Sequence, residues 1–207
     1  MRILLNVVWI AGIIYATIPA FWLAIHPFTK FWRSRQSGVY RWLGSIWLAE
    51  IFAAAAITHP LMPQRLYSTP FSWIAFAVLA WMAISVYRRV GRGFSRDTVI
   101  GRVELEPQQH EQKLVTTGMH GRVRHPLYLA HFFMLTALTA GSGLAALYAM
   151  WGFAILTGAL MVRFEEVELE RRFGDAYREY KRRVPAIFPR ASSGEGEAGG
   201  DGRGAGF

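Results

Sequence analysis

The hydrophobic residues of this chain fall into long blocks separated by polar segments. Ile3 to Ile25 carries no formal charge, Trp42 to Thr58 contains only Glu50, and Phe71 to Tyr87 is again uncharged. A helix needs about 20 apolar residues to cross about 30 Å of hydrocarbon, and each block approaches or exceeds that length. The first block is longer than the apolar region of a cleavable signal peptide, so it is predicted to be a retained membrane span.

A fourth apolar region, Leu127 to Phe164, is interrupted only by His131 and Arg163 and is too long for one crossing. Gly-Ser-Gly at 141–143 disfavours a continuing helix and divides the region in two. The pattern therefore predicts an all-α polytopic membrane protein with five transmembrane helices, the last two forming a tight hairpin. A soluble protein with buried core helices does not account for runs this long and this free of charge.

The charged residues predict an orientation. The chain has 23 lysines and arginines against 14 acidic residues, a net charge of +9. Alternate connections between the predicted spans are basic, and the opposite side holds only Arg2 and Arg65. The positive-inside rule then places the N-terminus outside and the C-terminus in the cytoplasm, in what we expect to be a bacterial inner membrane. The basic residues are thus expected to meet anionic lipid headgroups of the bilayer, and no nucleic-acid partner is expected.

Composition excludes several kinds of chemistry. The chain has no cysteine, which rules out disulfides, thiolate metal ligands and a cysteine nucleophile. No group of histidines and carboxylates has metal-ligand spacing, so no metal is expected. We predict three parts: residues 1–87 as three N-terminal transmembrane helices, 88–190 as a cytoplasmic loop, the hairpin and a C-terminal helix with the functional site, and 191–207 as a disordered glycine-rich tail.

Arg124-His125-Pro126-Leu127-Tyr128 opens the fourth predicted span. Proline suits the first position of a helix, which places His125 near the N-cap and Tyr128 about one turn inside. Unpaired backbone N–H groups and a partial positive charge gather at such a helix start and suit an electron-rich ligand. A plain helix start with Tyr128 as an interfacial aromatic is the alternative explanation.

Glu165 and Glu166 lie at the end of the fifth predicted span, where the hairpin would bring them close to His125. Adjacent helical residues point about 100° apart, so at most one of the two is expected to face the hairpin, and the other to meet water or an arginine. Downstream, apolar residues recur every three or four positions from Phe173 to Val184. This spacing predicts an amphipathic cytoplasmic helix that lies on the membrane or covers a pocket.

These motifs carry a family resemblance over roughly residues 112–189. Leu114 to Gly118, Arg124 to Tyr128, Glu165-Glu166 and Val184-Pro185 resemble the C-terminal signature of the isoprenylcysteine carboxyl methyltransferase family, whose relatives include phospholipid and small-thiol methyltransferases. The resemblance implies S-adenosylmethionine as cofactor and a prenylcysteine-like carboxylate, a lipid or a small thiol as methyl acceptor. It implies cofactor contacts from Gln112, Lys113, Leu114, Val115, His120, His125, Pro126, Leu127, Tyr128, Glu165 and Glu166.

Two departures from the family pattern concern substrate recognition. His120 stands where the family usually has an aromatic residue, and Leu160-Met161 stands where the prenylcysteine branch has an arginine. The acceptor-side candidates are therefore Arg163, His131 and Glu50. Glu50 lies mid-span, where a charge is costly, and His131 follows Tyr128 by three residues on the same helical face.

Both candidates inside the spans also have structural interpretations. Glu50 as a protonated acid bonded to a neighbouring helix, and His131 as a packed histidine bonded to a serine or threonine, fit the sequence as well. Two other functions stay open: an NADPH-dependent reductase resembling the sterol reductases, which share an Arg-His-Pro-x-Tyr stretch, and a non-enzymatic membrane protein on the same scaffold. The sequence assigns no general base and no oligomeric state.

Overall fold

The computed structural model describes residues 1–33, 38–91 and 113–189, and the regular secondary structure in these ranges is helical. Four helical stretches are long and apolar enough to cross a membrane: Arg2–Phe28, Val39–Leu61, Phe71–Gly91 and Ala145–Phe173. A further helix, α7 (Pro126–Ser142), has 17 residues and is shorter than these four. The described part of the chain is therefore all-helical and belongs to an integral membrane protein, and the five-span topology with a membrane hairpin stays a prediction.

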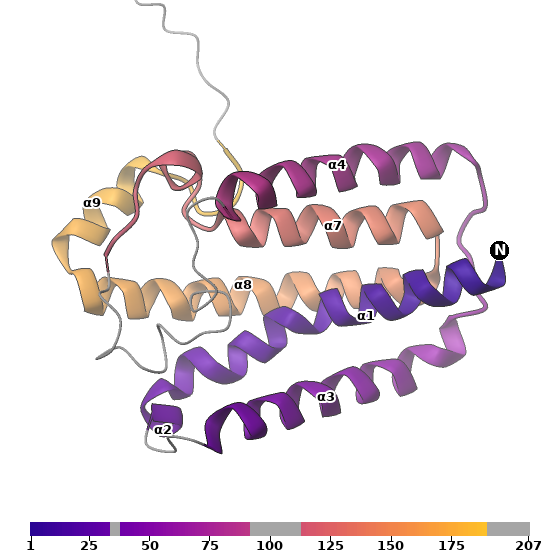
Figure 1. Cartoon of the computed structure of the whole chain (residues 1–207), viewed down its shortest axis with the longest axis horizontal. Helices are drawn as coiled ribbons and strands as arrows, with labels where there is room; N and C mark the ends of the chain where they lie inside the picture. The colour runs from indigo at the N-terminus through magenta and orange to yellow at the C-terminus, as the bar shows by residue number, and fades with distance from the viewer. Residues whose placement is uncertain (34–37, 92–112, 190–207) are drawn as a thin grey trace, which may run out of the picture.

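The long helices run side by side (Figure 1). In order across the bundle they are α3 (Val39–Thr58), α1 (Arg2–Ile25), α8 (Ala145–Phe173), α7 and α4 (Phe71–Gly91). The most extensive packing is between α4 and α7 and between α1 and α8. Nine of the 17 residues of α7 are buried, whereas α3 buries three of its 20 residues, so α7 is central and α3 faces outward.

Each junction around α7 and α8 has a local cause in the sequence. Pro126 starts α7, where the missing N–H has no partner to lose. Gly143 ends it with a φ of +67°, and a Cβ atom there would lie 2.5 Å from the carbonyl oxygen of Tyr67. Only glycine fits both restrictions. Gly174, with a φ of +56°, ends α8 and redirects the chain into α9 (Asp175–Arg183).

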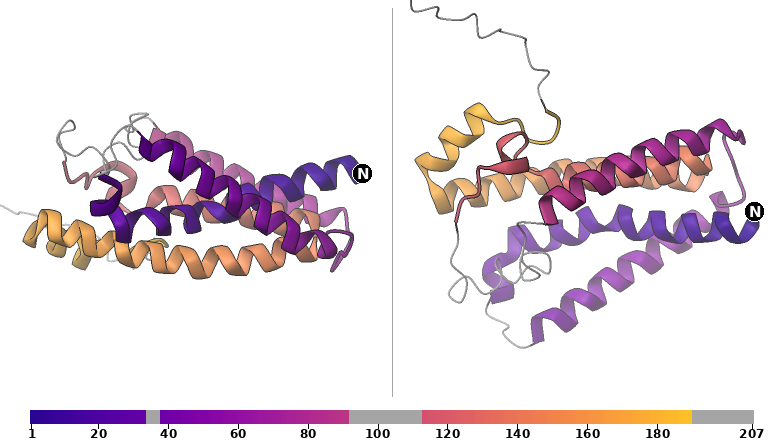
Figure 2. Two further views of the ribbon diagram at one scale, coloured as in Figure 1. Left: turned by 90° about the horizontal axis from the view of Figure 1, so that it is seen from below. Right: turned by 45° about the horizontal axis from the view of Figure 1, so that its top comes forward.

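The two ends of the bundle are built from different segments of the chain (Figure 2). We call one the turn end, made of residues 62–72 and 140–145, where the α7–α8 turn lies. We call the other the polar end, made of residues 113–128 and 163–186, where α9 packs on the end of α8 and the chain after α9 meets the segment before α7. The basic ends of α4 and α8 lie at the polar end. Gln112 and the predicted disordered tail lie outside the described residues.

Candidate functional site

Backbone pairing fixes the segment that leads into α7. The Arg124 N–H donates to the Pro185 carbonyl at 2.8 Å, and the His125 N–H donates to the Ala186 carbonyl at 2.9 Å. The chain following α9 is thus tied to the residues preceding α7. The His125 side chain is only 4% exposed, and its ring stacks on Tyr128 one turn later, with centroids 5.5 Å apart and planes 14° apart.

His125 lies between the two adjacent carboxylates of α8. Its Nδ1 is 3.5 Å from Glu165 Oε2, and its Nε2 is 3.3 Å from Glu166 Oε1. The expectation that at most one carboxylate would face the hairpin is therefore wrong. The helical offset between the two is real, but the imidazole has a nitrogen on each side and meets both. No helix C-terminus opposes these charges, because α8 continues to Phe173.

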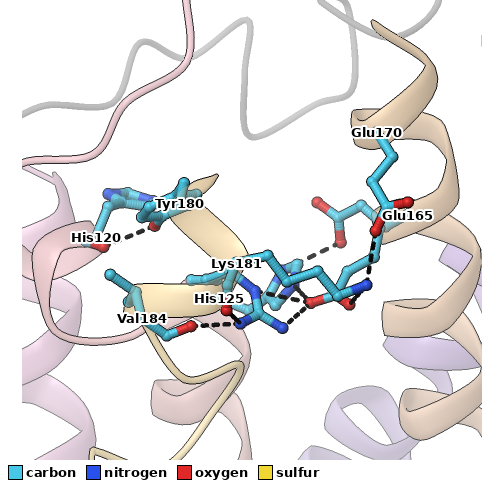
Figure 3. A network of polar contacts seen from close by, with 9 residues as sticks. His120, His125, Glu165, Glu170, Tyr180, Lys181 and Val184 are labelled. Atoms are coloured by element: carbon cyan, nitrogen blue, oxygen red, sulfur yellow. Dashed lines mark hydrogen bonds and ion pairs between the residues drawn. The ribbon is translucent and has the colours of Figure 1, made fainter. Parts of the chain in front are cut away.

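An ionic network centred on Glu166 joins α8, α9 and the segment before α7, and Lys181 and Glu170 of this network are labelled in Figure 3. The Arg124 guanidinium donates to Glu166 and to the carbonyl oxygens of Val184 and Lys181. Lys181 Nζ lies 3.0 Å from Glu166 Oε2 and 2.7 Å from Glu170 Oε1. Hydrogen bonds to Glu170 and then to Glu166 raise the pKa of Lys181, which keeps it charged. Every charge in the network is therefore compensated.

A cluster of aromatic and aliphatic side chains packs α9 against the end of α8 and the segment around Leu114. Tyr177, Tyr180 and Val184 are buried together, and Leu114 packs against them. The Tyr180 hydroxyl donates to the His120 carbonyl at 2.6 Å (Figure 3). Burial raises the pKa of Tyr180 to about 12, so the hydroxyl remains a donor at neutral pH. Burial, followed by the nearby His125, lowers the pKa of His120, which keeps that ring neutral.

Glu165 differs from its neighbour in one respect that matters for ligand binding. Glu166 accepts from Arg124, His125 and Lys181, whereas the Oε2 atom of Glu165 is buried and accepts no hydrogen bond within the described part of the chain. A buried carboxylate oxygen without a hydrogen bond is costly unless a partner binds there. The site thus holds one carboxylate, Glu166, whose oxygens are fully hydrogen-bonded, and one, Glu165, that can accept a further hydrogen bond. Both lie beside His125.

The structure brings together most of the residues implied as cofactor contacts. Leu114, His120, His125, Tyr128 and the two glutamates lie at the polar end. Pro126 and Leu127 form the first turn of α7 there, and Lys113 and Val115 lie in the exposed stretch before it. Gln112 lies outside the described residues. This set of contacts stays a prediction, because proximity alone does not show binding.

The three acceptor-side candidates do not meet in one place. Arg163 is exposed on α8, and Glu50 lies half-buried midway along α3, which packs mainly on α1. His131 is inside the bundle, where its Nδ1 lies 2.9 Å from the Tyr87 hydroxyl. Its partner is therefore a tyrosine of α4 and not the serine or threonine that the alternative interpretation named.

Arg124 and Lys181 are the site residues that sequence reasoning did not single out. Arg124 entered the sequence analysis only as the first residue of the Arg-His-Pro motif, and Lys181 only as part of the basic cytoplasmic charge. Their partner Glu166 is 42 residues from Arg124 and 15 from Lys181 along the chain, so no local spacing links them. The available signal was the pair of acidic residues at a membrane boundary that favours cations, which calls for cationic partners.

Comparison with known proteins gives three informative relatives. The chain is 36% identical over 125 residues to the nickel-cobalt-cadmium resistance protein NccN of Alcaligenes xylosoxydans xylosoxydans, which covers 58% of this chain and 54% of the relative. It is 30% identical over 167 residues to methanethiol S-methyltransferase 2 of Bradyrhizobium diazoefficiens, covering 78% and 51%. It is 25% identical over 132 residues to protein-S-isoprenylcysteine O-methyltransferase of Schizosaccharomyces pombe, covering 61% and 54%.

Two of these relatives are methyltransferases by name. The chain is thus related, at modest identity, to the membrane methyltransferases that include the isoprenylcysteine carboxyl methyltransferases. It spans about half the length of the curated relatives it matches. No protein-family model and no solved structure matches it. Among the described residues, no group of three or more histidines and carboxylates is arranged to hold a metal ion.

Proposed function

We propose that this protein is an S-adenosylmethionine-dependent methyltransferase of the membrane, with its cofactor site at the polar end. The single observation that carries the proposal is the pairing of His125 with two carboxylates of which only Glu166 is saturated. A purely structural ion cluster needs no second buried acceptor, whereas a polar ligand does. The two methyltransferase relatives support the reaction class.

The residues present fit this cofactor chemically. Glu165 can accept a hydrogen bond from a ribose hydroxyl or from the methionyl ammonium, and charge-assisted bonds of this kind are the stronger ones. The stacked rings of His125 and Tyr128 offer an aromatic surface of the kind that favours cations. When bound, the cofactor supplies a methyl group already activated on a sulfonium. The chain then has to hold the reactants in line and keep water away.

The proposal includes a topology. We place α7 as the fifth crossing, since 17 residues at 1.5 Å each span about 25 Å of the hydrocarbon layer. The polar end then faces the cytoplasm, because the basic last turns of α4 and α8 lie there. A polar cofactor would enter from the cytoplasm, and a lipophilic or small acceptor would arrive from the bilayer.

Ligand titration tests the proposed function. Isothermal titration of the detergent-purified chain with S-adenosylmethionine, S-adenosylhomocysteine and NADPH should show binding of the first two only. Glu165→Ala should weaken S-adenosylhomocysteine binding about tenfold or more, as expected when a charge-assisted contact is lost. Glu50→Ala, a glutamate in the middle of α3, is the matched control and should leave the affinity unchanged.

Each alternative has its own outcome in this experiment. Binding of NADPH alone would support the reductase, and binding of no ligand would support a non-enzymatic protein. Equal losses for Glu165→Ala and Glu50→Ala would show that the site lies elsewhere. Incubation of labelled S-adenosylmethionine with total lipid extract and a panel of small thiols, followed by mass spectrometry, would then identify the acceptor.

The resistance relative suggests a second candidate function. Its name links it to tolerance of nickel, cobalt and cadmium, and it matches this chain at 36% identity. A role of this chain in metal tolerance would appear as poorer growth of a deletion strain in these metals. Rescue by the unmodified gene but not by Glu165→Ala would tie that role to the polar end.

A further inference from the structure

A second group of polar side chains lies inside the bundle, apart from the ionic network of the polar end. The Tyr87 hydroxyl of α4 and Nδ1 of His131 of α7 are 2.9 Å apart. The Tyr15 ring of α1 lies against the imidazole, with centroids 4.6 Å apart. Three helices therefore bring one histidine and two tyrosines to one place. An ionisable residue inside a membrane bundle is costly and is by default a candidate functional position.

Two polar atoms in this group lack their ordinary partners. His131 Nε2 is buried and makes no hydrogen bond to the described residues. The Tyr15 carbonyl has no donor from its own helix, because residue 19, four positions later, is a proline without an N–H. The imidazole interacts with the Tyr15 backbone, but Nε2 makes no hydrogen bond of normal geometry with it. His131 Nε2 and the Tyr15 carbonyl can therefore each still form a hydrogen bond at this site.

This spot lies next to the proposed cofactor site along α7. Tyr128 and His131 are three residues apart, so they share a helical face and differ by about 4.5 Å in depth. Tyr128 in turn stacks on His125, which contacts both glutamates. A path of polar and aromatic side chains therefore leads from the ionic polar end toward the centre of the bundle.

We propose that His131 and Tyr87 bind the reacting head of the methyl acceptor, and that this head is uncharged, with a thiol as the best match. This rests on the proposed function. The described side chains that contact His131, Tyr15 and Tyr87, carry no charge, so among these residues no cation would compensate an anionic carboxylate. Arg163, the arginine closest in sequence to the family's carboxylate-binding position, is exposed on α8.

The reaction balances with groups already named. The acceptor's sulfur forms a bond to the methyl carbon, while the bond from that carbon to the sulfonium breaks and its electron pair stays on the departing sulfur. The thiol proton is released to water, while His131 and Tyr87 hold the sulfur in line with the methyl carbon. A thiol is acidic enough for this release, since its ordinary pKa is about 8.5.

Two probes with the same tail distinguish the acceptor classes. Purified full-length protein is supplied with methyl-labelled S-adenosylmethionine and either 1-decanethiol or decanoate. We expect methylation of the thiol and not of the carboxylate. His131→Phe keeps a ring against Tyr15 but removes both nitrogens, and it should lower kcat/KM for decanethiol about tenfold or more with S-adenosylhomocysteine affinity unchanged. His131→Gln should restore part of the loss.

Tyr87→Phe and Tyr67→Phe form a matched pair. Each removes one tyrosine hydroxyl that is hydrogen-bonded to α7, the first at the proposed acceptor site and the second at the turn end. Tyr87→Phe should lower kcat/KM for decanethiol severalfold, whereas Tyr67→Phe should leave it unchanged. Equal effects of the two, or a His131→Phe variant that loses only thermal stability, would show a packing role and overturn the inference.

The remaining outcomes separate this inference from the proposed function. Methylation of decanoate, or S-adenosylhomocysteine binding without methylation of decanethiol, overturns the acceptor assignment while the cofactor site stands. Failure of the unmodified protein to bind S-adenosylhomocysteine overturns the proposed function and the acceptor assignment with it.

Discussion

The two ends of the α7–α8 pair are held by different kinds of polar contact. At the turn end, side chains of residues 65–72 donate to the last carbonyls of α7, which have no partners within the helix. Arg65 donates to Ser142 at 3.0 Å, Tyr67 to Ala140 at 2.6 Å, and Ser72 to Gly141 at 2.8 Å. These three carbonyls, which the helix end would leave unpaired, therefore all accept hydrogen bonds.

At the polar end the contacts run between side chains and carry charge. Arg124, His125 and Lys181 surround Glu166, while Oε2 of Glu165 beside it accepts no hydrogen bond from the residues that the structure describes. The two ends of this helix pair therefore have different roles. The turn end fixes the relative position of α7 and α8, and the polar end uses that fixed position to hold a carboxylate that is not fully satisfied. The polar end therefore combines a buried ion pair that stabilises the fold with a carboxylate oxygen that can still accept from a ligand.

The largest effect on stability is expected from Glu166→Ala at the polar end. Its side chain and that of Arg124 are 11% and 8% exposed, so the change leaves a buried guanidinium without its carboxylate. Removing one partner of a buried ion pair costs about 3–5 kcal/mol. Thermal unfolding in detergent should show a large fall in midpoint, together with release of α9 as increased proteolysis near residue 174.

Glu170→Ala is the matched control for that change. Glu170 also binds Lys181 but is 33% exposed, and an exposed pair contributes about 0–1 kcal/mol. A loss as large as that of Glu166→Ala would mean that Lys181, and not Arg124, organises the network.

Gly143→Ala tests the turn end and should be the next largest effect. The added Cβ would meet the Tyr67 carbonyl oxygen at 2.5 Å, and the positive φ disfavours any side chain. Strain of about 1–2 kcal/mol and overpacking of about 1–3 kcal/mol give a loss of about 3 kcal/mol. Gly152→Ala on α8, where a Cβ meets nothing within 4 Å, should leave the unfolding midpoint unchanged or slightly raised. Equal midpoints for the two variants would contradict a rigid turn.

Tyr67→Phe removes a single contact from the turn end and should have a smaller effect. The hydroxyl donates to Ala140 and lies 2.8 Å from the Tyr148 hydroxyl. Loss of a hydrogen bond of this kind costs about 1 kcal/mol. The unfolding midpoint should fall modestly, and Tyr148→Phe, which leaves the Tyr67–Ala140 bond in place, should lower it less. A larger loss from Tyr148→Phe would place the main anchor on α8.

The helices of this bundle were predictable because their limits have local causes. Apolar runs with Pro126 before one helix and Gly143 after it indicate nearly the observed bounds, and the Gly-Ser-Gly break falls where α7 ends. The proximity of Glu165 and Glu166 to His125 followed from the same reasoning, since two helices joined by a short turn run antiparallel, side by side.

The partners of individual side chains were not predictable in the same way. Both glutamates reach His125 because the ring lies between them, which depends on the rotation of α7 against α8. His131 bonds Tyr87 because α4 packs on α7, and the two residues are 44 positions apart. Spacing along one helix carries no information on the rotation of another, so these contacts required the three-dimensional structure.

The smallest expected effect is a difference in pH response between the two ends. Burial, and then the proximity of His125, lowers the pKa of His120 in the folded protein. The unfolded chain then binds more protons, so the contribution of His120 to stability is complete above the ordinary histidine value of 6.5 and is lost as the pH falls through and below it. His120→Asn keeps the backbone carbonyl that accepts from Tyr180 but cannot titrate. Its unfolding midpoint should therefore fall less than that of the unmodified protein between pH 7 and about pH 5.

At the turn end, burial and the Tyr148 hydroxyl raise the pKa of Tyr67 to about 12, so Tyr67→Phe should lower the midpoint by the same amount at every pH in that range. A His120→Asn protein with an unchanged pH response would show that the acid sensitivity of the polar end arises elsewhere.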